Sequence, residues 1–269
     1  MLAIKNNIMA ENAARHLGQT YDALAKSVER LSSGLRINSA KDDAAGLAVR
    51  ESMRADIAVL EQGARNAQDG ISMLQTMEGA MGTIDAALVR MKQLAEQAAT
   101  GSYSDAQRTI MDSEFDEMAA EIERIAGATS FNGVKMLDNS ASVTIHFGGS
   151  SDYIQIAGSN MTKSGLGING LNIADAASAK AALGTLDSAI STKDTARAKF
   201  GYEMNRLEST VEVLNIQAEN MMASESRVSD VDVATEMAVM TRNQVLANAG
   251  VAMLAQANSM PQMALNLLG

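Results

Sequence analysis

Residues that could carry out acid–base or metal chemistry are few in this chain and lie apart. The two histidines, His16 and His146, fall in a predicted helix and a predicted strand, far apart in the sequence. Histidine binds a metal or transfers protons when a second ligand or base lies at a suitable spacing. Neither histidine has such a neighbour, so we expect surface or structural roles. The chain has no cysteine, which excludes disulfides and thiolate metal sites.

A glycine-rich segment formally matches the dinucleotide-binding fingerprint. Gly165, Gly167 and Gly170 have the required spacing. The fingerprint binds a pyrophosphate only inside a βαβ unit whose second strand ends in an acidic residue. The surrounding sequence predicts no such unit, so a flexible loop is the favoured interpretation.

A group of carboxylates in the middle of the chain could be imagined as acid–base pairs. Its members are Asp112, Glu114, Asp116, Glu117, Glu121 and Glu123. Their helical spacing favours a solvated face opposite Phe115, Met118 and Ile122. The triplet 160–162 matches a glycosylation sequon, which is weak evidence without the cellular context. With no nucleophile–base pair, phosphate loop or metal cluster, the sequence predicts no enzyme and no cofactor.

The composition excludes some classes of binding partner. The net charge of −10 argues against nucleic acid or an anionic membrane surface, both of which attract basic patches. The sequence has no run of 18 consecutive apolar residues, so it predicts no membrane-spanning helix. The N-terminus lacks the basic and apolar regions of a cleaved secretory signal, so these rules alone predict a cytoplasmic protein.

The spacing of apolar residues predicts long helices. Aromatic residues make up 3% of the chain and Pro261 is its one proline, so we expect an aliphatic core and uninterrupted helices. Alternating spacings of three and four begin at Leu17 and continue in helices over 44–100, 105–127 and 178–222. Ser39–Asp42 resembles a capping box that opens the second helix. Lys193 and Arg197 occupy apolar positions of the 178–222 pattern, so packing should loosen there.

A change of period marks a small β element. Asn132-Gly133 is a tight-turn sequence. Alternating apolar residues predict a hairpin over 141–157, within a β region of residues 130–157, and residues 158–176 are loop-rich. The predicted fold class is mainly α, a long helical coiled-coil or bundle rod with a small β-hairpin region.

The last predicted helix, which begins near Val231, has an unusual surface. No residue after Arg242 carries an ionisable side chain. One apolar stripe contains Met237, Met240, Ala247, Val251 and Leu254, and a second contains Val239, Leu246, Met253, Met260 and Leu267. Two stripes cannot both be buried against one partner helix. Burial in a core, in a multi-chain assembly or in a membrane are the alternatives, and the many Asn and Gln side chains favour assembly.

Several long strings identify a family resemblance. They are LSSGLRINSAKDDAAGLA at 31–48, NAQDGISMLQTMEGA at 66–80, SFNGVKML at 130–137, and the C-terminal part from ESRVSDVDVATEMAVMTRNQVLANAG onward. These strings resemble bacterial flagellin, in a short form without large variable outer domains. The match covers about residues 1–137 and 195–269.

The resemblance implies an organisation, a location and partners. Residues 1–40 and 226–269 would form an inner coiled-coil domain, and residues 41–225 an outer core domain. The protein would polymerise into the flagellar filament for motility. It would leave the cell unfolded through the flagellar type III apparatus with an export chaperone, so extracellular replaces cytoplasmic. Its partners would be copies of itself and the hook-associated junction and cap proteins.

The two-striped ends predict the assembly residues. They are Leu17, Leu24, Val28, Leu31, Met237, Met240, Leu246, Val251, Met253, Leu254, Met260 and Leu267. Before assembly these ends should be disordered or bound to a chaperone. A hook–filament junction protein, a secreted membrane-inserting translocator and a secreted hydrolase are the alternatives.

Family resemblance also implies recognition by the flagellin-sensing Toll-like receptor. The matching positions are Arg90, Leu94 and Glu114. Arg90 and Leu94 share a helix face away from the apolar seam, so we expect Leu94 to be an exposed contact. A contact between filament subunits is the alternative role of this patch, and the two roles are compatible.

Overall fold

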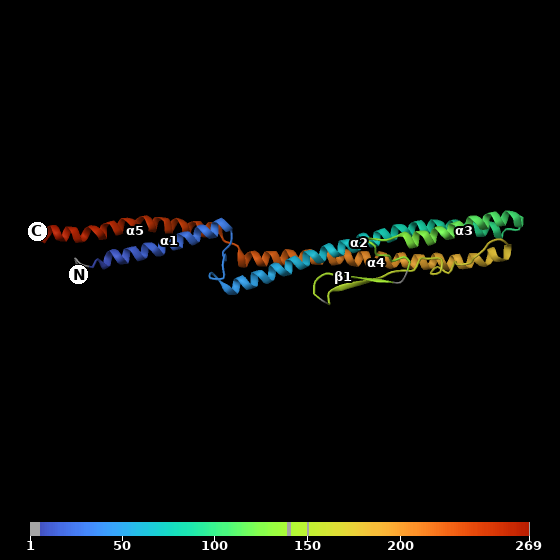
Figure 1. The fold of residues 1–269 in the computed structure, drawn as a ribbon, viewed down its shortest axis with the longest axis horizontal. Coiled ribbons are helices and arrows are strands. Elements are labelled where there is room, and N and C mark those ends of the chain that lie inside the picture. Colours follow the sequence, from blue (N-terminus) through green and yellow to red (C-terminus); the bar gives the residue numbers. More distant parts are fainter. Residues whose placement is uncertain (1–5, 139–140, 150, 269) are drawn as a thin grey trace. The chain divides into compact units, whose positions relative to one another are not determined.

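The computed structural model describes residues 6–138, 141–149 and 151–268, without the side chains of residues 261–262 and 264–268. Five helices and one antiparallel sheet of two strands form the described chain (Figure 1). In chain order they are α1 (Ile8–Ser33), α2 (Ala44–Ala99), α3 (Asp105–Ala128), β1 (Ser142–His146), β2 (Tyr153–Ala157), α4 (Ala176–Ser229) and α5 (Val233–Leu268). The predicted mainly α class with a small hairpin is confirmed. No helix in the described ranges combines the length and apolar character needed to cross a membrane.

The chain divides into two compact units. We call residues 1–56 with 220–269 the terminal unit, and residues 57–219 the middle unit. Both borders lie inside helices, α2 and α4, so no loop marks them. The division predicted from the resemblance, with borders after residues 40 and 225, stays a prediction.

The core of the middle unit is formed by stripes on three helices. The α4 stripe alternates spacings of three and four, as the sequence pattern predicts. It contains Ala179, Ala182, Leu186, Ala189, Lys193, Ala196, Phe200, Glu203 and Leu207, all at most 8% exposed. Helix α2 contributes Met77, Met81, Ile84, Leu88 and Met91, each 0% exposed. Helix α3 adds Phe115 and Ile122, and Phe147 beside the hairpin is a third buried phenylalanine in a mainly aliphatic core.

Packing does not loosen at Lys193, so that part of the prediction is wrong, and Ala196 rather than Arg197 continues the buried stripe. Lys193 is 2% exposed because its ammonium group pairs with Asp85 and with Asp194. Burial lowers the pKa of Lys193, but hydrogen bonds from its ammonium group to Asp194 and Asp85 outweigh this effect and leave the pKa raised. Arg197 pairs with Glu78 at 3.1 Å. Paired charges can occupy seam positions that an unpaired charge could not.

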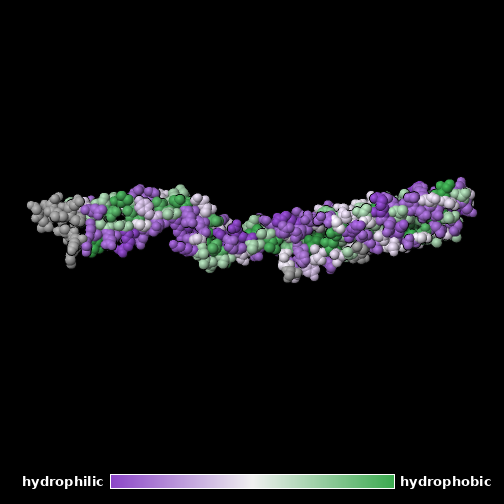
Figure 2. Space-filling view, in the orientation of Figure 1, coloured by the Kyte–Doolittle hydropathy of each residue, from purple (hydrophilic) through white to green (hydrophobic). Residues whose placement is uncertain are grey.

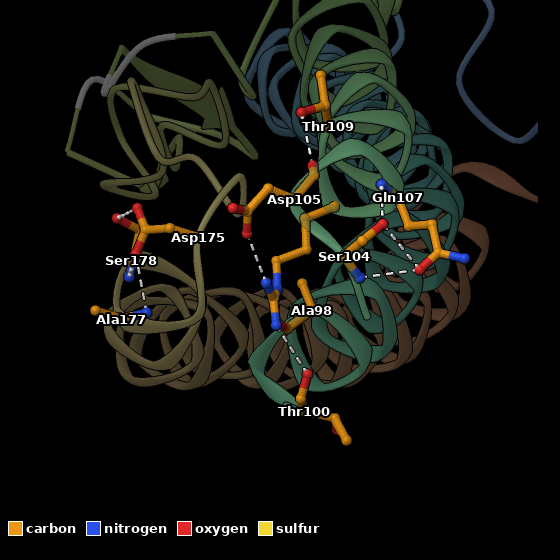
Figure 3. A network of polar contacts seen from close by, with 10 residues as sticks. Ala98, Thr100, Ser104, Asp105, Gln107, Thr109, Asp175, Ala177 and Ser178 are labelled. Atoms are coloured by element: carbon orange, nitrogen blue, oxygen red, sulfur yellow. Dashed lines mark hydrogen bonds and ion pairs between the residues drawn. The ribbon is translucent and has the colours of Figure 1, made fainter. Parts of the chain in front are cut away.

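Arg108 holds together the turn from α2 to α3. Its buried guanidinium donates to the carbonyls of Ala98 (2.9 Å) and Thr100 (3.1 Å). Carbonyls at the end of a helix such as α2 have no partner within the helix, so Arg108 satisfies them. It also pairs with Asp105 at 2.9 Å. The capping box Ser104–Gln107 begins α3 beside these partners (Figure 3). The sequence pattern did not indicate this role for Arg108.

The hairpin lies where the alternating pattern predicts it. Ser142 is opposite Ala157, and His146 is opposite Tyr153. The hairpin packs closely on α2, since a Cβ added to Gly63 would lie 2.1 Å from the Phe147 carbonyl oxygen. The predicted turn at 132–133 is also confirmed, because both residues have positive φ, 50° and 80°.

Residues 158–175 form an ordered loop, where the sequence suggested a flexible one. Its apolar side chains Met161, Leu166, Ile168 and Ile173 are buried. Gly167 and Gly170 have φ of 70° and 74°, so a backbone requirement explains these glycines. Loop N–H groups donate to carboxylates of α3: Lys163 to Glu123 at 2.8 Å, and Ile173 to Asp112 at 2.7 Å. These two carboxylates therefore position the loop. Asp112 is partly buried, whereas Glu123 is exposed, as the predicted solvated face requires.

The segment between α1 and α2 belongs to the terminal unit. Ser39 and Asp42 bond to each other, but they form a turn before the helix. Asp43 is the residue whose side chain accepts the Gly46 N–H at 2.9 Å, so the predicted capping box is displaced from the helix start. Helix α4 also extends beyond the predicted 178–222, to Ser229.

Candidate assembly surface

Helices α1 and α5 lie side by side and antiparallel in the terminal unit (Figure 1). Near the start of α1, the Asn7 side-chain amide donates to the Ala257 carbonyl at 2.7 Å. Near its end, Arg30 pairs with Glu236 at 3.4 Å. Residue numbers rise on α1 as they fall on α5, so the two ends of the chain pair in the way that the sequence suggests.

Small residues form much of the seam between the two helices. The α1 positions are Ala10, Ala13, Leu17, Thr20, Leu24, Ser27 and Leu31, and those of α5 are Glu236, Met240, Asn243, Ala247, Gly250, Leu254 and Ala257. A Cβ added to Gly250 would lie 3.1 Å from Cδ1 of Leu17, so the backbones approach closely there. Close approach brings small side chains together and leaves larger ones on the flanks of the seam.

The predicted assembly residues therefore fall into two groups. Leu17, Leu24, Leu31, Met240, Leu254 and Met260 are partly buried. Five others are exposed: Val28 (51%), Met237 (44%), Leu246 (50%), Val251 (49%) and Met253 (63%). Leu267 lies outside the described side chains. The seam thus contains Met240 and Leu254 of the first predicted stripe, whereas Leu246 and Met253 of the second stripe are exposed beside it.

We call Val28, Met237, Leu246, Val251 and Met253 the assembly surface. Figure 2 shows apolar patches over α1 and α5 in the part that it colours. Tyr21 and Val245 are 50% and 61% exposed on the same helices. Leu246, Val251 and Met253 lie on the part of α5 after Arg242, which has no charged side chain. Large exposed apolar side chains on such a segment are typical of a surface that another protein covers.

Charged side chains make ion pairs and hydrogen bonds near the end of α1 and the start of α5. Lys26 pairs with Asp42 at 2.7 Å and lowers the pKa of that carboxyl to about 2, with further hydrogen bonds from Ser39. Asp232 precedes α5 and accepts from the Thr235 hydroxyl, which lowers the pKa of Asp232. These polar contacts therefore lie near the end of α1 and the start of α5, whereas most of the exposed apolar side chains of the assembly surface lie farther toward the C-terminus of α5.

The residues matched to receptor recognition lie in the middle unit. Arg90 of α2 and Glu114 of α3 form an ion pair of 2.6 Å, and both side chains are partly exposed. Leu94 is 2% exposed, which contradicts the expectation of an exposed contact. The reason is that α3 folds back along α2 and covers this face, which a single-helix projection cannot show.

The histidines do not meet in the structure. His16 is exposed on α1, and His146 contacts the Tyr153 ring at 5.5 Å between centroids. Within the described ranges, no group of three or more His, Cys, Asp or Glu side chains could hold a metal ion.

Comparison with known proteins decides the family. The model of the bacterial flagellin N-terminal helical region matches residues 4–142, and that of the C-terminal helical region matches residues 183–268. The chain belongs to the bacterial flagellin family.

Full-length relatives agree with this family. The flagellar filament 33 kDa core protein of Treponema phagedenis is 42% identical over 99% of this chain and all of that protein. A flagellin of Halalkalibacterium halodurans is 40% identical over 99% of this chain and all of that protein. The crystal structure of Bacillus cereus flagellin is 35% identical, with a TM-score of 0.50, over 60% of this chain and 94% of that one. The chain is thus a structural subunit of the extracellular bacterial flagellar filament.

Proposed function

We propose that the assembly surface is where this subunit contacts neighbouring copies in the filament. The observation that carries the proposal is the exposure of large apolar side chains on α5, a helix with no charged side chain after Arg242. Covering apolar surface contributes about 25 cal/mol per Å². Adjacent subunits, present at high local concentration in a growing filament, would supply that cover.

The same surface could in principle enter a membrane, as in a membrane-inserting translocator. Amide side chains are frequent on α5, among them Asn243, Gln244 and Asn248. Unpaired amides are costly in hydrocarbon, whereas a protein interface can pair them. Leakage of liposomes by the purified protein would support insertion, and filament formation without leakage supports assembly.

We further propose that the terminal helices gain much of their order on assembly. The seam between α1 and α5 consists largely of small side chains. An isolated subunit therefore buries little apolar area there to offset the conformational entropy lost on ordering. An export chaperone and the type III export apparatus would handle the chain in that open state. This state also suits passage through a narrow export channel.

Circular dichroism and limited proteolysis of monomer and filament test this idea. We expect the monomer to lose helix and to be cleaved within α1 and α5, while the middle unit resists protease. The filament should regain the helical signal and protect both ends. A monomer whose terminal helices are fully formed and resistant to protease contradicts the proposal.

The remaining partners are copies of the same chain and the hook-associated junction and cap proteins. We propose a purely structural role without catalysis or cofactor, in line with a family of filament proteins. A hook–filament junction role is the nearest alternative. Abundance separates the two, because a filament contains mostly its main subunit and few junction proteins.

Receptor recognition is a second proposal, carried by the exposed Arg90–Glu114 pair that joins α2 to α3. Leu94 would contribute indirectly, by keeping α3 against α2. We expect Arg90→Ala to reduce signalling by the flagellin-sensing Toll-like receptor without changing the melting temperature. Unchanged signalling by the Arg90→Ala, Leu94→Ala variant would contradict receptor recognition at this site.

A further inference from the structure

Three ion pairs join α2 to α4 along the middle unit, and we call them the ionic ladder. They are Glu78–Arg197, Asp85–Lys193 and Lys92–Asp187. The first is 3.1 Å long and the last 2.5 Å. The α2 members are seven residues apart, and their numbers rise as those of their α4 partners fall. The ladder therefore joins two antiparallel helices, and it spans two heptads on α2 but only 10 residues, from Arg197 to Asp187, on α4.

The apolar seam beside the ladder discriminates poorly between alignments. On α2 the fully buried side chains from Leu74 to Met91 are Leu, Met and Ile throughout. On α4 four alanines recur among the larger buried side chains Leu186, Phe200 and Leu207. A shift of one heptad, about 10 Å along the axis, would again place apolar side chains opposite one another. Methionine adapts to irregular spaces, which makes such shifted packing less costly.

The order of charges in the ladder does discriminate. Along α2 the charges are negative, negative and positive, and their partners on α4 have the complementary signs. A slip of about one heptad in one direction places Lys92 opposite Lys193 and brings Asp85 near Arg197. A slip in the other direction places Asp85 opposite Asp187 and brings Glu78 near Lys193. Each slip therefore replaces three complementary pairs by one complementary pair and one like-charge contact. Because Lys193 is almost fully buried, a second cation beside it would be poorly screened.

We propose that the ionic ladder sets the register of α4 on α2 when the chain folds. Buried ion pairs often add little net stability, but charged or polar residues in a helical seam can specify alignment. This role differs from the proposed assembly contacts, and its test does not depend on polymerisation. A subunit folded in a slipped register would display its surface residues about 10 Å out of place along α2.

A charge swap separates register from stability. The Lys92→Glu, Asp187→Lys variant keeps three complementary pairs but makes the α2 members all negative and the α4 members all positive. Slipped alignments then carry no like-charge contact. The matched control, Glu78→Arg with Arg197→Glu, also keeps three pairs, but its alternating signs penalise slips in both directions.

Spin labels can report the register directly, because the chain has no cysteine of its own. Labels on cysteines at the exposed positions Gln75 and Ser191 would lie on α2 and α4 at different axial heights. Pulsed electron paramagnetic resonance then measures the distance distribution after full-length protein is refolded from denaturant. A one-heptad slip changes the axial offset by about 10 Å.

We expect one distance population in the wild type and the control swap, and a second, displaced population in the Lys92→Glu, Asp187→Lys variant. Lys193→Met, which removes the buried charge, should also show the second population without a lower melting temperature. A single wild-type population in both of these variants would overturn the proposal.

Discussion

The two units use the same heptad spacing but bury very different amounts of apolar side chain. In the middle unit three helices and a hairpin enclose Phe115, Phe200 and a row of methionines that are 0% exposed. Among the described residues of the terminal unit, the buried apolar side chains are Ile37, Ala247 and Ala257. A pair of helices has one seam and two flanks, so periodicity alone does not produce a core. A third layer is needed, and in the terminal unit we expect other subunits to supply it.

Charged substitutions in the assembly surface give the strongest test of this difference between the two units. Leu246→Asp combined with Met253→Asp should abolish polymerisation, because two carboxylates would have to be buried between subunits. The middle unit should keep its melting temperature, since neither residue belongs to it. Electron microscopy and sedimentation check assembly, and calorimetry checks the fold.

Leu246→Met with Met253→Leu is the matched control, since it keeps apolar character and should still form filaments. Normal filaments from the charged variant would show that this surface is not a subunit contact.

Truncation of a core phenylalanine should have the next largest effect. Phe115→Ala should destabilise the middle unit by about 3–5 kcal/mol, since the side chain is 0% exposed. Ile110→Ala on the same helix should change stability by less than about 0.5 kcal/mol, because Ile110 is 72% exposed. Denaturant unfolding measures both, and similar losses for the two variants would contradict the assigned core.

Two helical glycines, Gly184 on the exposed side of α4 and Gly250 in the seam between α1 and α5, differ in the space around them. Gly184→Ala in α4 should stabilise the middle unit by about 0.5–1 kcal/mol, since no atom lies within 4 Å of the added Cβ. Gly250→Ala should gain less, because its Cβ would lie 3.1 Å from Leu17. Thermal melts of both variants check this order, and an equal gain at Gly250 would show that α1 and α5 are loosely packed.

The smallest expected effect is a pH dependence of the terminal unit. Because Asp42 has a pKa of about 2 when folded and 3.8 in its unperturbed state, its ion pair with Lys26 stabilises the folded form above pH 4. This contribution should be lost as the pH falls from about 4 to 2. An NMR titration of the Asp42 carboxyl checks the pKa, and Asp42→Asn should flatten the stability profile in that range. A carboxyl that titrates near 4 would contradict the assigned pair.

Local patterns in the sequence determined the elements of this fold. One proline in 269 residues, alternating three and four spacings, and the Asn132-Gly133 turn predict the helices and the hairpin, although α4 extends seven residues beyond its predicted end. Each of these features acts within a few residues along the chain, by hydrogen bonds and steric limits of the local backbone. The part of α5 after Arg242, which has no charged side chain, likewise indicates from the sequence alone that its surface must be covered.

Tertiary structure decided which side chains of those elements are covered. Leu94 is buried because α3 returns over it, and Lys193 is buried because Asp85, 108 residues away, pairs with its charge. Asp112 and Glu123 lie on the polar side of their helix, yet they accept hydrogen bonds from a loop many residues later. Periodicity defines the faces of a helix but not the partner of each face. That partner is chosen by packing and by charges that are distant in the chain, and such pairings have no local pattern.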